Sequence, residues 1–428
     1  MKAAKEQCFD QLLLGKTAKS SDWLDGIRFD ALERARALNF PSDRDDNWRF
    51  TDLSALYAHA FRAVETFARL SLSDIDEFLI PGSIRLVFVD GSFAADLSDL
   101  SNAGAGLTAA SISECLGDRV VEANFGRYAP YKNDAFVALN TNFFEDGAWV
   151  HVKSDVVAPI HVLHVATSRE TPSAIYPRSM LVLESHSRAT VVEEYVGLGA
   201  GLYLSDAVTE VVLKDGARLR HARIQRENKS AFHIGHCSVA CGKDSIYEAT
   251  SLAFGARVSR HGLQVAQQYE AAEIHLNGLA LISGRQIADT HTRIDHAAPH
   301  GKSVQLHKCI ADDSAHAVFC GKIIVHPGSS GTDSEQSSRN LLLSDKAHID
   351  TQPQLEIFND DVSCKHGATI GQIDADALFF LKSRGLNEER ARSLLTHAFA
   401  AEVIDKIPVP FLVDSICNTI LENMGGTR

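Results

Sequence analysis

The fold is decided by residues 273–325, which read EIHLNGLALISGRQIADTHTRIDHAAPHGKSVQLHKCIADDSAHAVFCGKIIV. Short β-prone segments alternate here with turn clusters such as Ser283-Gly284, Pro299-His300-Gly301 and Asp312-Asp313-Ser314. Similar clusters recur from residue 240 to residue 328 at intervals of about 12 to 17 residues. A β-sandwich, a propeller and a β-solenoid would each produce this spacing.

Small residues at candidate inward positions favour the solenoid, because a narrow coil of stacked rungs needs them. These residues are Ala249, Ala253, Ala280, Ala288, Ala315 and Ala317. We therefore predict a mainly β protein with a solenoid core over residues 151–371. The expected strands are 179–183, 189–195, 208–213, 218–224, 246–253, 258–265, 273–276, 279–282, 286–294, 303–309, 315–319, 322–325 and 354–358.

The regions on either side of the core have a different pattern. Residues 1–80 show apolar side chains at helical spacing, and residues 81–150 are mixed α/β. Residues 372–428 are predicted to form a C-terminal helical domain. In it Asn387 caps a helix whose apolar face is Ala391, Leu394, Leu395, Ala398, Phe399 and Val403.

Composition limits the functional classes. The chain has 428 residues, a formal net charge of -13 and no Lys/Arg-rich run, which disfavours nucleic acid as a partner. No apolar stretch approaches the roughly 18 to 20 residues of a membrane helix, and we expect no membrane insertion. The first thirty residues lack a signal-peptide pattern. Eight dispersed cysteines are typical of reduced thiols, so we expect a cytoplasmic protein.

One short motif carries metal-binding chemistry. In the extended run 360–371, Cys364 and His366 would project to the same side because side chains alternate along a strand. A thiolate beside an imidazole suits iron, zinc or an iron-sulfur cluster. The two residues fill half of a tetrahedral shell, and the remaining ligands must come from elsewhere. The alternative is a small buried cysteine beside a hydrogen-bonded histidine.

Three segments around this motif resemble a known family. They are 338–344 (SRNLLLS), 350–357 (DTQPQLEI) and 364–369 (CKHGAT). Together they are similar to the C-terminal signature of the SufB/SufD scaffolds of the SUF iron-sulfur cluster assembly machinery, in the form found in the SufD branch. Gln352 departs from it, since Lys is expected there. Residues 47–53 (NWRFTDL) resemble the family's N-terminal motif, or form a loop anchored by its aromatic residues.

The resemblance implies a right-handed parallel β-helix between helical ends and a non-enzymatic scaffold. It also implies a SufB-like sister subunit and a SufC-like ABC ATPase, with Cys364 and His366 as ligands of a nascent iron-sulfur cluster at the partner interface. The C-terminal helical domain would dock the ATPase through Phe379, Leu394, Leu395 and Phe399, or would only cap the coil. A reduced flavin is expected in the assembled complex, and no residue identifies its site. Exposed coil edges would allow a homodimer of the isolated chain.

Other motifs give weaker signals. Gly301-Lys302-Ser303 lacks the first glycine of a phosphate-binding loop, because His296 stands there. His233, Cys237 and Cys241 would share one strand face about 13 Å apart, too far for one ion. Histidines at 291, 296, 300, 307, 316 and 326 are expected mostly at surfaces and turns. Two rival functions remain open: a β-helix enzyme acting on polysaccharide, and a stand-alone metal-binding protein using Cys237 and Cys241.

Overall fold

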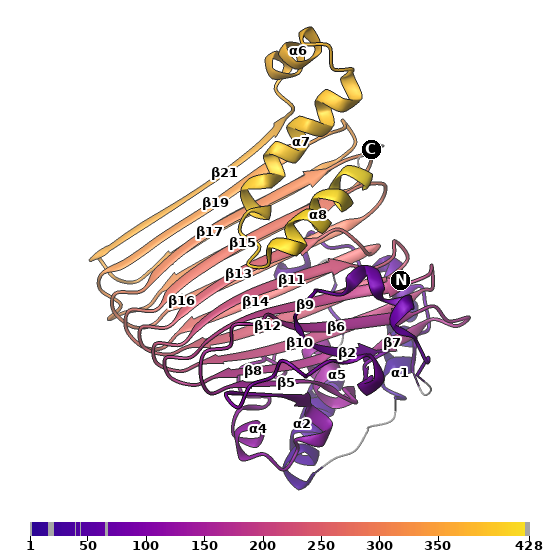
Figure 1. Ribbon diagram of the computed structural model, residues 1–428, viewed down its shortest axis with the longest axis vertical. Coiled ribbons are helices and arrows are strands. Elements are labelled where there is room, and N and C mark those ends of the chain that lie inside the picture. The colour runs from indigo at the N-terminus through magenta and orange to yellow at the C-terminus, as the bar shows by residue number, and fades with distance from the viewer. Residues whose placement is uncertain (1, 16–20, 39, 43, 65–66, 424–428) are drawn as a thin grey trace.

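The computed structural model describes residues 2–15, 21–38, 40–42, 44–64 and 67–423. Its core is a coil in which the chain passes alternately through two parallel sheets, seen as the broad stack of arrows in Figure 1. The strand order is β20-β18-β16-β14-β12-β10-β8-β5-β4 in sheet I and β21-β19-β17-β15-β13-β11-β9-β6-β2-β3 in sheet II. This confirms the predicted parallel β-helix core flanked by helices.

The strands are mostly about ten residues long. Sheet I consists of β1 (Arg62–Ala63), β4 (Leu107–Ser111), β5 (Gly147–Val152), β7 (Ser173–Ile175), β8 (Arg178–Leu183), β10 (Tyr203–Leu213), β12 (Phe232–Cys241), β14 (Val258–Gln267), β16 (Ile287–His296), β18 (His316–Val325) and β20 (His348–Ile357). Sheet II consists of β2 (Ile84–Val89), β3 (Ser92–Phe93), β6 (Ile160–Thr167), β9 (Arg188–Leu198), β11 (Arg218–Arg226), β13 (Ile246–Ala253), β15 (Glu273–Ile282), β17 (Lys302–Ala311), β19 (Thr332–Leu342) and β21 (Val362–Gln372).

From β8 onward, each strand stacks in parallel register on the strand one coil earlier. Glu273, for example, pairs with Ile246 on one side and with Lys302 on the other. Equivalent residues therefore form ladders, and the inner ladders of the two sheets pack against each other. Of the six predicted inward alanines, five are buried and Ala253 is half-buried. This burial confirms that small residues fill the narrow coil.

Two predicted strand breaks are wrong. The breaks expected around Gly278 and Gly321 fall inside the continuous strands β15 and β18. A Cβ atom at Gly278 would lie 2.3 Å from His307 Cδ2, and one at Gly321 would lie 2.1 Å from Gln336 Nε2. These glycines make room for polar side chains inside the coil; they do not form turns.

The first 150 residues form a helical layer and also contribute strands. The helices are α1 (Lys2–Leu12), α2 (Asp22–Leu38), α3 (Ser54–Tyr57), α4 (Arg119–Asn124) and α5 (Ala135–Phe143). Short 3-10 helices are η1 (Asp46–Trp48), η2 (Leu72–Asp74), η3 (Asp76–Phe78), η4 (Ala95–Leu97) and η5 (Ile112–Glu114). β2 and β5 already pair in parallel with coil strands, so the sheets begin before residue 151.

The helical layer covers the outer face of sheet I at the first coils. Trp48 is buried there beneath the Arg260 guanidinium, whose Cζ lies 3.9 Å from the ring centroid. Arg260 also donates to the carbonyl of Asn47 at 2.7 Å, and Thr51 donates to the Asp289 carboxylate. The motif at 47–53 therefore anchors the N-terminal region on the coil through Trp48, one of the two aromatic residues of the packing alternative, whereas Phe50 is half-buried.

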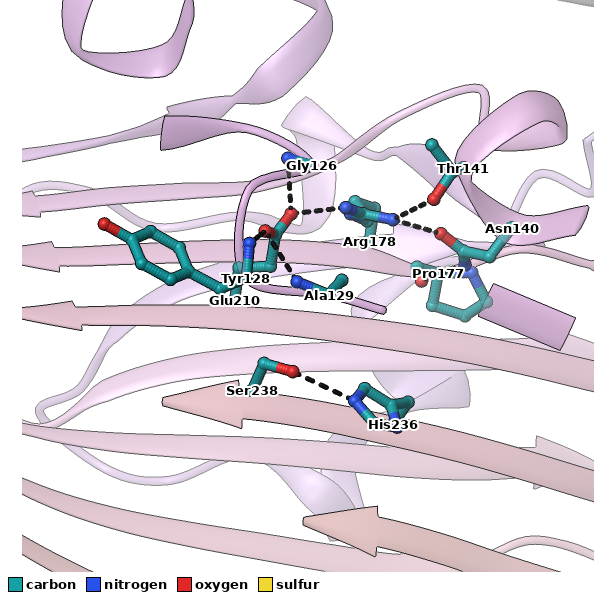
Figure 2. Close-up of polar contacts among 10 residues, drawn as sticks. All are labelled: Gly126, Tyr128, Ala129, Asn140, Thr141, Pro177, Arg178, Glu210, His236 and Ser238. Carbon is teal, nitrogen blue, oxygen red and sulfur yellow. Dashed lines mark hydrogen bonds and ion pairs between the residues drawn. The ribbon is translucent and has the colours of Figure 1, made fainter. Parts of the chain in front are cut away.

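A buried ion pair ties the same layer to sheet I (Figure 2). Arg178 on β8 and Glu210 on β10 have fully buried side chains and pair directly. Glu210 also accepts from the backbone N–H groups of Gly126, Tyr128 and Ala129 at 2.9, 3.0 and 3.2 Å. Arg178 donates to Asn140 and Thr141 in α5. The two Glu210 carboxylate oxygens thus position the loop 126–129, and Nη1 of Arg178 binds the helix α5.

Three helices follow the last strand: α6 (Ala375–Ser383), α7 (Glu388–Ile404) and α8 (Pro410–Asn423). Asn387 caps α7 as predicted, its side chain accepting from the Arg390 N–H at 2.8 Å. α7 and α8 lie on the outer face of sheet II, whereas α6 projects beyond β21 (Figure 1). Within the described ranges, no helix is long and apolar enough to span a membrane.

The buried face of α7 differs from the predicted one. Ala391 and Val403 are buried as expected, but Ala400 and Ile404 complete the buried face, and Leu394 is 48% exposed. The outer surface of sheet II selects this face, because Ala400, Val403 and Ile404 pack on Ile224, Leu281 and Ile310. The helix therefore has a second apolar residue set that faces solvent.

Candidate functional site

Cys364 and His366 lie on β21, the last strand of sheet II. They stand in register with Ser334 and Gln336 of β19, both of which are buried inside the coil. Cys364 packs against the inner core. The two predicted ligands therefore occupy the same, inward face of the last rung, as alternation along a strand requires.

The open end of the coil gives access to this face. β21 pairs with β19 on one side only, and every residue of β21 after Cys364 is exposed. His366 is exposed, whereas Cys364 is half-buried, and burial together with Asp333 raises the pKa of its thiol. A metal ion or cluster that binds Cys364 must therefore displace the thiol proton.

The pair remains half a coordination shell in this chain. Within the part of the chain that the structure describes, no third His, Cys or carboxylate side chain groups with Cys364 and His366. The remaining ligands of a tetrahedral site would have to be supplied from outside the chain. The free edge of β21 is where another chain could approach.

A second exposed surface lies on the projecting helices. Phe379 of α6 is 73% exposed and Leu394 of α7 is 48% exposed. Leu395 is half-buried. Phe399 is also half-buried because it packs on the sheet II cluster, with Lys308 Nζ 4.4 Å from its ring centroid. Of the four predicted docking residues, Phe379 and Leu394 are thus the most available to a partner.

The other predicted metal ligands lie inside the coil. His233, Cys237 and Cys241 are buried on the continuous strand β12. Burial raises the pKa of Cys237, and it raises that of Cys241 to about 12. Both thiols are therefore protonated at neutral pH. Of the histidine series that was expected mostly at surfaces and turns, His296 and His307 are buried, and the other four are half-buried or exposed.

A groove of about 860 Å³ runs between the N-terminal layer and the outer face of sheet I. Its lining includes Arg260, His291 and Cys320. Its aromatic lining residues, Trp48 and Phe136, are buried with ring centroids 5.5 Å apart. They present no exposed ring on which a sugar could stack, which is what a polysaccharide enzyme would need.

Sequence reasoning missed one group of side chains. His316 was seen as one of a histidine series, but His348 and Asp350, which lie beside it in the fold, were not considered. The available signal was the coil repeat, because His348 follows His316 by one full coil and pairs with it in register.

Two family models together cover most of the chain. The model described as "SUF system FeS cluster assembly, SufBD core domain" matches residues 164–399. The model described as "SufBD protein N-terminal region" matches residues 7–162.

Curated relatives give the same result. An iron-sulfur cluster assembly SufBD family protein of Synechocystis is 36% identical over 96% of this chain and 92% of its own length. The iron-sulfur cluster assembly protein SufD of Escherichia coli is 30% identical over 93% of this chain and 92% of its own. Protein ABCI7, chloroplastic, of Arabidopsis thaliana is 31% identical over 92% and 85%.

Proposed function

This chain belongs to the SufBD family of SUF-system iron-sulfur cluster assembly proteins, and we propose that it is the SufD-like scaffold subunit of a complex with a SufB-like sister chain and a SufC-like ABC ATPase. In this role it catalyses no reaction itself. The nascent cluster is its cargo, built at the interface with the sister chain. The free edge of β21, next to Cys364 and His366, is the observation that carries the proposal.

His366 supplies the more accessible ligand. Its imidazole is exposed at the mouth of the coil, whereas the Cys364 thiol is half-buried with a raised pKa. We assign His366 as a cluster ligand and Cys364 as a second ligand that binds once iron displaces its proton. A cysteine of the sister chain would complete the shell.

The projecting helices α6 and α7 are the proposed ATPase-docking surface. Phe379 and Leu394 expose apolar surface to water in the isolated chain, which is unfavourable. Burying this surface under a partner would contribute favourable free energy to binding. Because α7 also packs on sheet II, a movement of the ATPase pulls on the same sheet that ends in β21. Nucleotide-driven motion could thereby open and close the cluster interface.

The compartment we propose is the reducing cytoplasm, which agrees with eight free cysteines. In isolation, the same β21 edge would allow a homodimer. The reduced flavin expected in the complex has no identified site among the described residues of this chain.

The test is to co-express the chain with its sister and ATPase partners, purify the complex without oxygen, and measure iron and acid-labile sulfide. We expect His366→Ala to lower both by about tenfold, since losing a ligand weakens metal binding at least as much as losing its supporting contacts. The complex itself should stay intact.

Lys365→Ala is the matched control, because Lys365 lies between the two ligands on the opposite face of β21. It should leave the cluster content unchanged. If the complex is intact and its cluster content is the same for His366→Ala and the wild type, His366 is not a ligand and the cluster is bound by other residues. If no complex forms at all, the SufD-like assignment fails.

A further inference from the structure

Parallel register brings three metal-binding side chains together on the outer face of sheet I. His316 begins β18, and His348 begins β20 directly beside it. Asp350 follows His348 by two residues, so it points to the same face. The inward residues between them, Ala317 and Ile349, are buried in the coil. This packing fixes the outward direction of all three.

The side chains converge on one point. His316 Nε2 lies 2.8 Å and His348 Nε2 lies 3.2 Å from the same oxygen of Asp350, Oδ2. One ligand atom from each residue lies within 4.8 Å of those of the other two. Ligand atoms bound to a single ion at about 2.1 Å are separated by roughly 3 to 3.5 Å, so small ring rotations suffice to admit an ion.

This arrangement differs from the other histidine–carboxylate pairs. His151 with Glu184 and His326 with Asp295 are pairs of one imidazole and one carboxylate. In the part of the chain that the structure describes, the His316 group is the one place where three such ligands gather. Two imidazoles and one carboxylate select a divalent transition metal over Mg²⁺ or Ca²⁺, which prefer oxygen ligands.

The group is open to solvent and separate from the proposed cluster ligands. The side chain of His348 is 67% exposed, and those of His316 and Asp350 are 25% and 27% exposed. β20 is the terminal strand of sheet I, whereas Cys364 and His366 lie on the inward face of sheet II. An ion can therefore reach the group, and further ligands can approach from the free edge.

We propose that His316, His348 and Asp350 form a binding site for one divalent first-row transition-metal ion, of the Zn²⁺ or Fe²⁺ class, with coordination positions left open. The site stands on its own geometry and does not depend on the proposed scaffold role.

The experiment titrates the full-length, metal-free chain with Co²⁺ and follows the visible d–d absorption, then displaces Co²⁺ with Zn²⁺. The wild type should bind one Co²⁺ at this site. His348→Ala and Asp350→Asn should each weaken Co²⁺ binding by about 10- to 100-fold. His348 is exposed on a terminal strand and Asn has the shape of Asp, so both variants should fold, as circular dichroism will check.

Two controls locate the ion. His326→Ala removes a single histidine from Asp295, which also pairs with Arg293, and should leave Co²⁺ affinity unchanged. Cys364→Ser with His366→Ala removes the proposed cluster ligands, so the Co²⁺ binding that persists in this double variant belongs to the His316 group. The proposal would be overturned if His348→Ala and Asp350→Asn bound Co²⁺ with wild-type affinity. It would also be overturned if Co²⁺ binding were lost only in the Cys364/His366 variant. Cluster content of the complex is measured separately, so this result and that of the scaffold test are independent.

Discussion

Arg178 and Glu210 hold opposite charges where no solvent reaches either side chain. Removing two charges from water is costly, and their attraction offsets the cost only when the remaining hydrogen-bonding atoms are satisfied. Glu210 meets this condition by accepting from three backbone N–H groups of the loop 126–129. The pair therefore fixes the position of the N-terminal layer more than it adds net stability.

Glu210→Gln should lower the free energy of unfolding by about 3 to 5 kcal/mol, because it leaves the Arg178 charge buried without its partner. Urea unfolding followed by circular dichroism measures this. The matched control is Glu248→Gln, which breaks the pair of Arg220 and Glu248, 63% and 45% exposed. It should cost no more than about 1 kcal/mol. Equal losses in the two variants would contradict the argument.

Histidines inside the coil make stability depend on pH. Burial lowers the pKa of His307 from 6.5 to about 3, and its ring stacks on Phe319 with centroids 4.3 Å apart. Below pH 6.5 the unfolded chain takes up a proton that the folded chain excludes. The stability that the neutral His307 side chain contributes is therefore fully present above pH 6.5, and it declines as the pH falls towards 3.

His307→Phe keeps an aromatic ring beside Phe319 but removes the titration. Between pH 6.5 and 4.5 the wild type should lose about 2 kcal/mol more free energy of unfolding than this variant. Phe319→Leu serves as the control, since it weakens the same contact without removing a titrating group. In Phe319→Leu the free energy of unfolding should depend on pH as it does in the wild type. A weaker pH dependence in this variant would mean that the effect comes from packing and not from titration of His307.

The helix α7 has one buried apolar face and one exposed apolar face. One face, with Ala400, Val403 and Ile404, packs on sheet II, and the other presents Leu394 to solvent. The neighbouring helix α6, which contacts α7, carries the exposed Phe379. Exposing such apolar side chains adds no stability to the isolated chain, so their exposure favours a partner surface. The same helix thus connects that surface to the coil.

Phe379→Ser combined with Leu394→Ser should weaken binding of the proposed ATPase partner by about 2 kcal/mol or more, roughly 30-fold, with little change in unfolding. Isothermal titration calorimetry with the purified ATPase measures it. Phe29→Ser is the control, because Phe29 is 70% exposed on another helix, α2. If Phe29→Ser weakens binding as much, or the double variant binds normally, α6 and α7 are not the docking surface.

Local sequence patterns predict where helices and strands lie better than they predict which face of each element packs against the rest of the protein. The turn spacing left three β folds open, and the small residues together with the family resemblance selected the coil. The Asn387 cap was sufficient for the start of α7. The continuity of β15 through Gly278 was not predictable, because it depends on His307 from the next coil. The exposure of Leu394 likewise depends on which α7 face the sheet selects. His348 and Asp350 join His316 only through register across one coil.

The two ends of the coil differ in how their edge strands are covered. At the start, the antiparallel strands β3 and β4 close the sheets and the N-terminal helices cover sheet I. At the finish, β20 and β21 each have a free edge, and apolar Ile357, Phe358 and Ile370 are exposed. An uncovered end of this kind invites strand pairing with another chain. Pro353, which lacks an N–H donor, lies within β20, where an edge strand tolerates it.

Ile370→Glu should therefore weaken association with the proposed sister chain, and any homodimer of the isolated chain, by about tenfold or more, because a charge would be buried at the joined ends. Sedimentation velocity across a concentration series measures both. Val157→Glu is the matched control, since Val157 is 97% exposed in the loop between β5 and β6 of the first coils. It should leave association unchanged. If Val157→Glu disrupts association and Ile370→Glu does not, the chains join through the opposite end, and Cys364 and His366 would then lie away from the interface.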